Sequence, residues 1–163
     1  MPSIISHGII GYLLFGYEGV FWATLPDIIG FTRYFTRIGY DYLKNMEKNK
    51  KLNWPNPDLM DKTDWKLYDI SHSLIFWIVL LFIFKKKEIY AGIISVILDI
   101  FLHEKKEWRG PKFLYPLSEY NFDGIKWDSI LGITITITII IILSNLNNNQ
   151  KNKLIHKFYL PDY

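Results

Sequence analysis

Apolar residues gather in blocks along this chain, and charged or asparagine-rich stretches separate the blocks. The first two blocks, residues 4–15 and 19–29, lie on either side of the pair Gly16 and Gly19. Paired glycines interrupt helices, so we expect the chain to turn back here and the two blocks to form an antiparallel helical hairpin. The alternative is one helix of about 22 residues, which is long enough to span a bilayer.

A second hairpin is predicted from the apolar stretches 67–84 and 89–103. Ser71 or Asp69 is expected to cap the first of its helices. The lysines at 85–87 end that helix and turn the chain into the second one. The stretch 67–84 shows no polar face over most of its length, which is typical of a helix surrounded by lipid or protein core.

The last apolar block, residues 130–143, alternates isoleucine and threonine, which is also the pattern of a strand. We favour a transmembrane helix, because about 17 uncharged residues lie between Asp128 and Asn145, close to the minimum for a span. Threonine is compatible with such a helix, since its hydroxyl can hydrogen-bond back to the helix backbone.

The remaining segments are polar connections. Residues 40–69 are predicted to be a surface insert with a short helix or two. Residues 104–128 are too long for a simple connector, and their aromatic side chains favour an ordered loop on the lipid headgroups. The predicted fold is therefore all-α: a single helical membrane domain over 1–144, built from two antiparallel hairpins plus a C-terminal transmembrane helix, followed by a loose polar tail over 145–163.

Composition supports a membrane protein. Half of the 163 residues are hydrophobic and 17% are aromatic, and the apolar residues are concentrated in blocks. A soluble all-α domain with short helices is the less favoured alternative. The net charge is only +3 and the lysines are scattered, so nothing indicates a nucleic-acid partner. The absence of cysteine excludes disulfides and thiolate metal sites.

Both predicted hairpins carry polar side chains at matching heights. His7 lies roughly ten residues before the first turn and Asp27 roughly ten after it. His72 lies about 14 residues before the second turn, while Asp99 and His103 lie about 12 and about 16 after it. Because antiparallel helices rise equally per residue, each hairpin brings its polar side chains to a common end.

These residue types suggest a metal site. Asp99 stands in an otherwise apolar helix, where a carboxylate is costly unless it is paired or bound, and His103 follows four residues later on the same face. Imidazole and carboxylate are the usual ligands of zinc and related divalent metals, which activate water for hydrolysis. The plainer interpretations are a helix cap for Asp27, which follows Pro26, and contact with water or a lysine for Asp99.

Five short motifs together resemble a known family: SHGIIGYLL, LPDIIGF, LYDISHSLIFW, LDIFLHEKK and FLYPLSEYNFDG, in this order over roughly residues 4–130. The chain is similar to the membrane-bound metal-dependent hydrolases, which include the LexA-regulated inner-membrane hydrolases and distantly resemble zinc-dependent phospholipase C. The resemblance implies metal binding by five residues: His7, Asp27, His72, Asp99 and His103. Zinc is the expected metal, with manganese or iron as alternatives.

Two positions depart from the pattern of that family. Members often have a second acidic residue after the Pro-Asp pair, where this chain has Ile29. Many also have a histidine four residues before the acidic residue of the fourth motif, where this chain has Ser95. These departures leave three alternatives for the metal site: it is reduced, shifted toward His103, or lost.

The leading hypothesis is a metal-dependent hydrolase that acts on a phosphoester or lipid-linked substrate through metal-activated water. Asp27 or Asp99, or Glu119 in the long loop, would serve as general base if it is not a ligand. The alternative is a non-catalytic helical membrane scaffold or interaction protein with a vestigial metal site. The expected location is the inner or plasma membrane, with membrane lipid as a partner. The lysines at 85–87 lie opposite the site, which places the site on the outer face.

Overall fold

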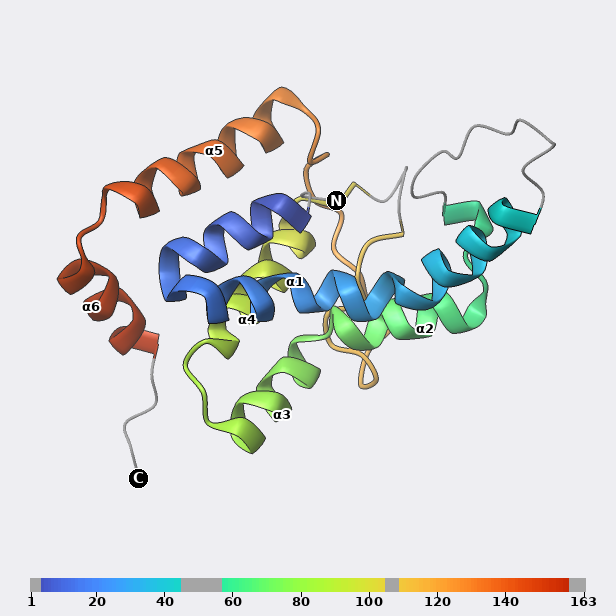
Figure 1. The fold of residues 1–163 in the computed structure, drawn as a ribbon, viewed down its shortest axis with the longest axis horizontal. Helices are drawn as coiled ribbons and strands as arrows, with labels where there is room; N and C mark the ends of the chain where they lie inside the picture. The colour runs from blue at the N-terminus through green and yellow to red at the C-terminus, as the bar shows by residue number, and fades with distance from the viewer. Residues whose placement is uncertain (1–3, 45–56, 105–108, 159–163) are drawn as a thin grey trace.

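The structure is a computed structural model that describes residues 4–44, 57–104 and 109–158. Over these residues the chain is helical and contains no strand (Figure 1), which confirms the all-α class. The elements are α1 (Ile4–Lys44), the short 3-10 helix η1 (Pro57–Leu59), α2 (Lys62–Ser71), α3 (Leu74–Phe84), α4 (Ile89–Phe101), α5 (Ile130–Asn145) and α6 (Asn148–Phe158).

Helix α1 is divided at Gly16, whose backbone has the non-helical angles φ 67° and ψ −150°. A Cβ atom at Gly11 would lie only 2.3 Å from the carbonyl oxygen of Gly19. On a continuous helix, residues eight positions apart are about 12 Å from each other along the axis. The chain therefore reverses at Gly16, and Figure 1 shows the first arm lying back along the second. The second arm continues to Lys44, well beyond the predicted end at residue 29.

The helix predicted to start after Ser71 or Asp69 and to run to Phe84 starts later, at Leu74, and residues 67–71 belong to the helix before it. The structure has two helices there, α2 and α3, which are bent by 55° from each other. Neither Ser71 nor Asp69 caps a helix; Ser73 is the N-cap of α3, and its hydroxyl accepts a hydrogen bond from the Ile75 N–H. A serine that satisfies a first-turn N–H of α3 allows a new helix to begin, so the helical axis can change direction at this point.

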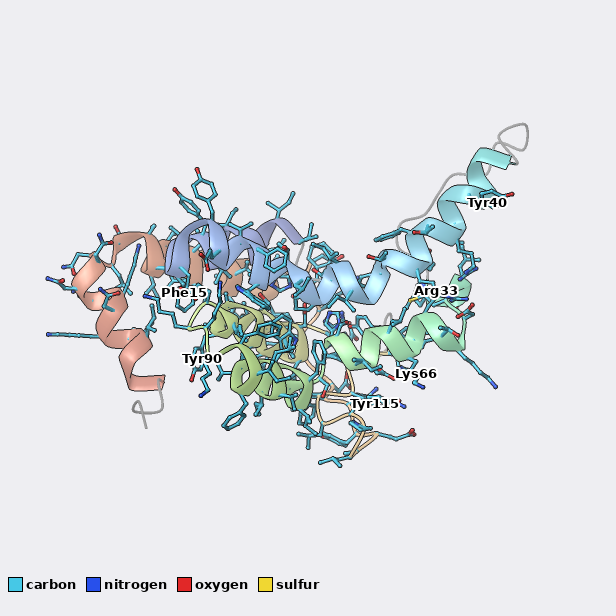
Figure 2. All side chains as sticks on the ribbon, turned by 60° about the horizontal axis from the view of Figure 1, so that its bottom comes forward. Phe15, Arg33, Tyr40, Lys66, Tyr90 and Tyr115 are labelled. Carbon is cyan, nitrogen blue, oxygen red and sulfur yellow. The ribbon has the colours of Figure 1, made fainter. Side chains whose placement is uncertain are left out.

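The start of α2 falls inside the predicted polar insert, of which residues 45–56 lie outside the described residues. Asp61 and Asp64 cap α2 by reciprocal side-chain and backbone hydrogen bonds. Arg33 and Arg37 of α1 each place a guanidinium nitrogen 2.5 Å from a different carboxylate oxygen of Asp64, which is fully buried. These contacts, near the labelled Arg33 in Figure 2, hold the last part of α1 along α2.

The core lies where α1 packs on α4 and α2, and where α3 packs on α4. Trp77 of α3 is fully buried, and a Cβ atom at Gly92 of α4 would lie 2.1 Å from its ring. Only glycine at residue 92 therefore lets the indole lie against the α4 backbone. At the far end of the bundle, Lys86 approaches Glu18 to 3.6 Å, so the two turns lie side by side.

The long loop is pinned to the helix ends near one end of the bundle. The Leu74 N–H donates to the Phe113 carbonyl at 2.8 Å, and the Gly124 N–H donates to the His103 carbonyl at 2.7 Å. The described part of this loop, residues 109–128, forms no helix. The tail that was predicted to be loose instead forms the helix α6, because Asn147 and Gln150 make a local capping arrangement at its start.

Within the described ranges, and by length and composition alone, the part of α1 over Ile4–Tyr40 is long and apolar enough to cross a membrane, and two bent pairs qualify if each is counted as one span. These pairs are α2 with α3 and α5 with α6. Helix α5 alone has 16 residues. Large apolar side chains are exposed along α3 and α5, among them Ile78, Val79, Phe82, Ile83, Ile133, Ile137, Ile141 and Ile142.

Candidate metal centre

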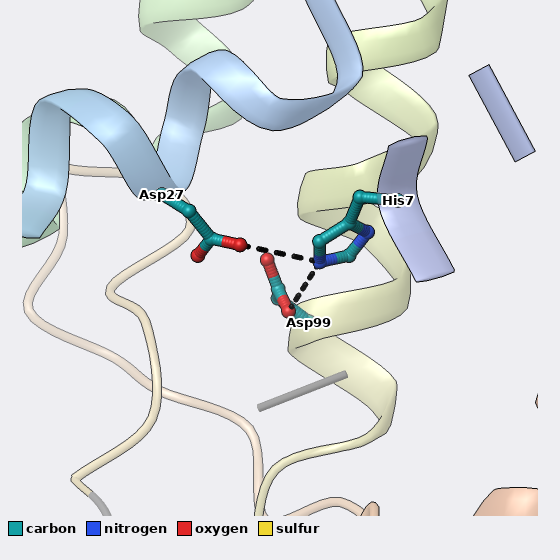
Figure 3. Close-up of side chains that lie close together, drawn as sticks. All are labelled: His7, Asp27 and Asp99. Carbon is teal, nitrogen blue, oxygen red and sulfur yellow. Dashed lines mark hydrogen bonds and ion pairs between the residues drawn. The ribbon is translucent and has the colours of Figure 1, made fainter. Parts of the chain in front are cut away.

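Four of the five predicted ligands meet in the interior of the structure. His7 Nε2 lies 3.2 Å from Asp99 Oδ1 and 3.9 Å from Asp27 Oδ2 (Figure 3). His72 Nε2 lies 3.4 Å from Asp99 Oδ2 and 3.5 Å from Asp27 Oδ1. The two imidazoles and the two carboxylates thus form a ring in which each carboxylate offers one oxygen to each imidazole. We call these four residues the His/Asp ring.

Three members of the His/Asp ring lie close enough together to hold a small divalent cation, and the fourth, His72, is not part of that group. Nitrogen and oxygen ligands about 2.0–2.1 Å from a tetrahedral zinc ion lie about 3.3–3.4 Å from one another. Three of the four contacts in the ring, at 3.2, 3.4 and 3.5 Å, are within about 0.2 Å of this value. Ligand atoms of three members, His7, Asp27 and Asp99, all lie within 4.8 Å of one another.

The ring is buried and its polar atoms are poorly satisfied. The exposed fractions of the four side chains are between 0% and 5%. Both oxygens of Asp27, Oδ2 of Asp99 and Nε2 of His72 have no hydrogen-bond partner among the described residues. The approaches of His72 to the two carboxylates are close enough for ion pairs but lack hydrogen-bond geometry. Buried polar atoms left in this state are costly, and a bound cation would satisfy them.

The protein backbone fixes which nitrogen of His72 faces the ring. His72 is the C-cap of α2, and its Nδ1 lies 3.0 Å from the Tyr68 carbonyl oxygen and 3.0 Å from Ser71 Oγ. A carbonyl oxygen only accepts hydrogen bonds, so Nδ1 carries a proton and Nε2 is the ring nitrogen that faces the carboxylates. Metal-binding histidines are oriented in this way by a partner on the other ring nitrogen.

His103 lies next to the His/Asp ring without joining its close contacts. Its Nδ1–H donates a hydrogen bond to the carbonyl oxygen of Asp99 at 2.7 Å, so in the neutral imidazole Nε2 carries the lone pair. That Nε2 atom is buried and has no hydrogen-bond partner in the described part of the chain. Burial lowers the pKa of His103 to about 4, so the imidazole is neutral at pH 7. A neutral imidazole with a free lone pair remains suitable as a ligand.

Close helix packing brings His72 to the carboxylates of the other helices. A Cβ atom at Gly30 of α1 would lie 3.2 Å from Cε1 of His72 and 2.9 Å from Oγ of Ser71. On the other side, the indole N–H of Trp77 donates to the Ser71 carbonyl at 2.7 Å. The prediction did not include Gly30, Ser71 or Tyr68, because their roles depend on which helix lies opposite them.

The other residues considered in the sequence lie in different settings. Ser95 is buried one turn before Asp99, and its hydroxyl has no partner among the described residues. Ile29 is half-buried. The side chain of Glu119 is 84% exposed and lies 3.2 Å from Lys112 Nζ, so the structure does not bring it to the ring.

The negative charge of the ring can be balanced in two ways. Two ionised carboxylates carry a charge of −2, which one divalent cation or two protonated imidazoles would balance. In the second case the ring is a set of buried ion pairs and needs no metal. In either state His72 directs Nε2 at Asp27 and Asp99.

Comparisons with family models, with curated proteins and with solved structures find no match to this chain. The resemblance to membrane-bound metal-dependent hydrolases, drawn from short motifs, therefore stays a prediction.

Proposed function

We propose that the protein is a metal-dependent hydrolase of the membrane, acting on a phosphoester or lipid-linked substrate. One observation supports this most strongly: two carboxylates and two imidazoles from three separate parts of the chain converge at 3.2–3.9 Å in a buried ring. Such a ligand set, with nitrogen and oxygen donors and no sulfur, suits zinc, and manganese or iron are alternatives.

The residues of the chain have distinct roles in this proposal. His7 and His72 would hold the cation through Nε2, and Asp27 and Asp99 would each contribute an oxygen. A divalent metal at this point lowers the pKa of a bound water and polarises a phosphoryl group. The carboxylate oxygen of Asp27 or Asp99 that is not a ligand would serve as the general base that accepts a proton from water. The neutral His103 beside the ring can extend the ligand set.

The proposed setting is a bilayer. We infer that the arms of α1 form one antiparallel hairpin, α3 and α4 form the other, and α5 is a C-terminal transmembrane helix. The exposed isoleucines of α5 and the exposed apolar face of α3 would contact lipid tails. The His/Asp ring and the lysines at 85–87 lie at opposite ends of these helices, so the positive-inside rule favours the outer face for the site.

The direct test is metal content. The wild type and the variants Asp99→Asn and His72→Ala would be purified in detergent, and bound metals would be measured by elemental mass spectrometry. We expect about one or two zinc, manganese or iron ions per wild-type chain, and their loss in both variants. His156→Ala is the matched control, because it removes a histidine of α6, outside the ring, and should leave the metal content unchanged.

Circular dichroism would show whether each variant keeps its helices, so that loss of metal is separated from loss of fold. A folded wild type that holds no metal after reloading would refute the metal site. Hydrolysis would then be tested on the metal-loaded protein with phosphodiester and phospholipid substrates, beside the two variants. Absence of turnover with a loaded site would refute the hydrolase while leaving the metal site intact.

A second candidate function is a non-catalytic membrane scaffold. It is favoured by the hydrogen bond between His7 Nε2 and Asp99 Oδ1 at 3.2 Å, which joins α1 to α4 without any cation. Interhelical polar contacts in a bilayer stabilise by about 0.6–2 kcal/mol each. In this case Asp99→Asn would lower the unfolding temperature of the metal-free protein, and chelators would have no effect on the wild type.

A further inference from the structure

The start of helix α6 is fixed by its own sequence. The Asn147 N–H donates to Gln150 Oε1, and the Gln150 N–H donates to Asn147 Oδ1, both at 2.9 Å. This reciprocal pair is a capping box, which fixes the start of a helix locally. Helix α6 therefore does not need support from the bundle to form its first turn. In the described part of the chain, α6 is not among the helices that pack extensively on one another. Figures 1 and 2 show it beside the bundle.

The direction of α6 suits a helix that lies along a membrane surface. The axis changes direction by 117° between α5 and α6. If α5 crossed the membrane without tilt, a change of 90° would place α6 in the membrane plane, and the excess is 117 − 90 = 27°. Transmembrane helices are tilted by about 20° on average, with a range of about 0–40°. An ordinary tilt of α5 therefore brings α6 into the plane of the headgroups.

The charge of α6 has one sign. Its sequence, NNQKNKLIHKF, contains three lysines and no acidic residue. Leu154 and Ile155 are neighbours on α6, and helical spacing places Lys151, three and four residues before them, on the same side, while Lys153 lies on another. Leu154 is 41% exposed, so the apolar side is not covered by the bundle. A basic helix with an exposed apolar side is typical of a segment at the membrane interface.

The turn between α3 and α4 adds charge at the same end of the molecule. Its three lysines, at 85–87, are exposed. Both views show this turn and α6 at the same end of the molecule (Figures 1 and 2). The His/Asp ring lies toward the opposite ends of α3 and α4, because His72 comes just before α3 and Asp99 is near the end of α4. Glu18 offsets part of this charge through its contact with Lys86, but the surface as a whole is basic.

We propose that α6 and the lysine turn together form a docking surface for anionic phospholipid headgroups. The lysines attract the phosphate groups, Leu154 and Ile155 enter the boundary with the acyl chains, and α5 continues directly into the bilayer. This surface fixes which end of the bundle faces the anionic leaflet. The proposal rests on the transmembrane placement of α5 proposed above, and not on a metal or on catalysis, since none of its residues belongs to the His/Asp ring.

The chain contains no cysteine, so single cysteines can be introduced without background labelling. Leu154→Cys and the matched control Asn152→Cys, which points to the other side of α6, would each be labelled with a polarity-sensitive fluorophore in the full-length protein. The labelled proteins would be placed in nanodiscs of phosphatidylcholine alone or of phosphatidylcholine with phosphatidylglycerol. Quenching by an aqueous quencher and by lipids that carry a nitroxide would be measured for each label.

We expect the label at residue 154 to shift its emission to the blue in the anionic nanodiscs, to be quenched by the nitroxide lipids and to be shielded from the aqueous quencher. High salt, or replacement of the three α6 lysines by glutamine, should reverse most of this change. The label at residue 152 should stay accessible to the aqueous quencher in every nanodisc.

Equal accessibility of the two labels in anionic nanodiscs would overturn the proposal. So would shielding of residue 154 that is the same in both lipid compositions and insensitive to salt, because the headgroup charge would then play no part. Shielding that requires two copies of the protein in one nanodisc would indicate a contact between chains and would also overturn it.

Discussion

Replacing Gly30 by alanine should weaken metal binding while leaving the fold intact. The added Cβ atom would lie 3.2 Å from Cε1 of His72 and 2.9 Å from Oγ of Ser71. The hydroxyl of Ser71 can rotate, but it lies 3.0 Å from His72 Nδ1 and helps to hold the imidazole. Both effects act on the position of the same ring.

The size of the effect follows from these distances. Carbon atoms in contact prefer separations of about 3.5–4.0 Å, so the imidazole must move by roughly 0.3–0.8 Å. Metal–ligand distances tolerate only about ±0.2 Å, so this shift exceeds what the coordination allows. Disturbing the groups that orient a ligand typically lowers metal affinity by about 10–100-fold. The same substitution gains about 0.8–1 kcal/mol of helix propensity, which offsets the crowding.

The assay is metal affinity in detergent, measured by competition with a chelator, together with the unfolding temperature of the metal-free protein. Gly39→Ala is the matched control: it lies on the same helix and gains the same propensity, and an added Cβ atom meets nothing within 4 Å. We expect lower affinity only for Gly30→Ala, and similar or higher stability for both variants. If Gly30→Ala binds the metal as tightly as the wild type, His72 is not a ligand in the manner proposed.

Two further predictions concern stability. Gly92→Ala would place a Cβ atom 2.1 Å from the buried indole of Trp77, and we expect a loss of about 1–3 kcal/mol, visible in unfolding followed by tryptophan fluorescence; an unchanged transition would contradict the packing. The hydrogen bond from Arg33 lowers the pKa of Asp61 to about 2, below the value of about 3.9 expected in the unfolded chain. Asp61 therefore stabilises the fold fully above about pH 3.9, and this contribution disappears as the pH falls through about 2. Stability measured against pH should show this loss in the wild type and not in Asp61→Asn.

The relative heights of the site's side chains could be predicted from the sequence, because every α-helix advances by the same distance per residue. Counting residues from two turns placed His7 level with Asp27, and His72 level with Asp99 and His103. The structure brings four of these side chains together within 3.9 Å, although their positions in the chain are up to 92 residues apart. The count needs only the position of each turn and the direction of each helix.

The same reasoning failed where local hydrogen bonds compete with hydrophobicity. The expected cap of the apolar helix was Ser71 or Asp69, but Ser73 caps it, so α2 continues through Ser71 and His72 lies at the break between two helices. Hydrophobic pattern alone cannot choose among these caps, since a serine at either position can cap a helix. In the tail, a predominantly polar sequence suggested a loose chain, but Asn147 and Gln150 form a capping box that begins α6.

The relative strengths of the contacts indicate which of them fix the alignment of the helices around the two turns. The Lys86–Glu18 pair joins the two turns, but both side chains are more than half exposed, and such pairs contribute about 0–1 kcal/mol. The close approaches are stronger constraints: Gly11 meets Gly19 between the arms of α1, and Trp77 covers Gly92 between α3 and α4.

A slip of one residue would move a helix by about 1.5 Å and bring a larger side chain into each of these contacts. The same slip is several times the tolerance of a metal–ligand distance. The glycines that allow the helices to touch therefore also hold the His/Asp ring at its spacing, although none of them is a ligand.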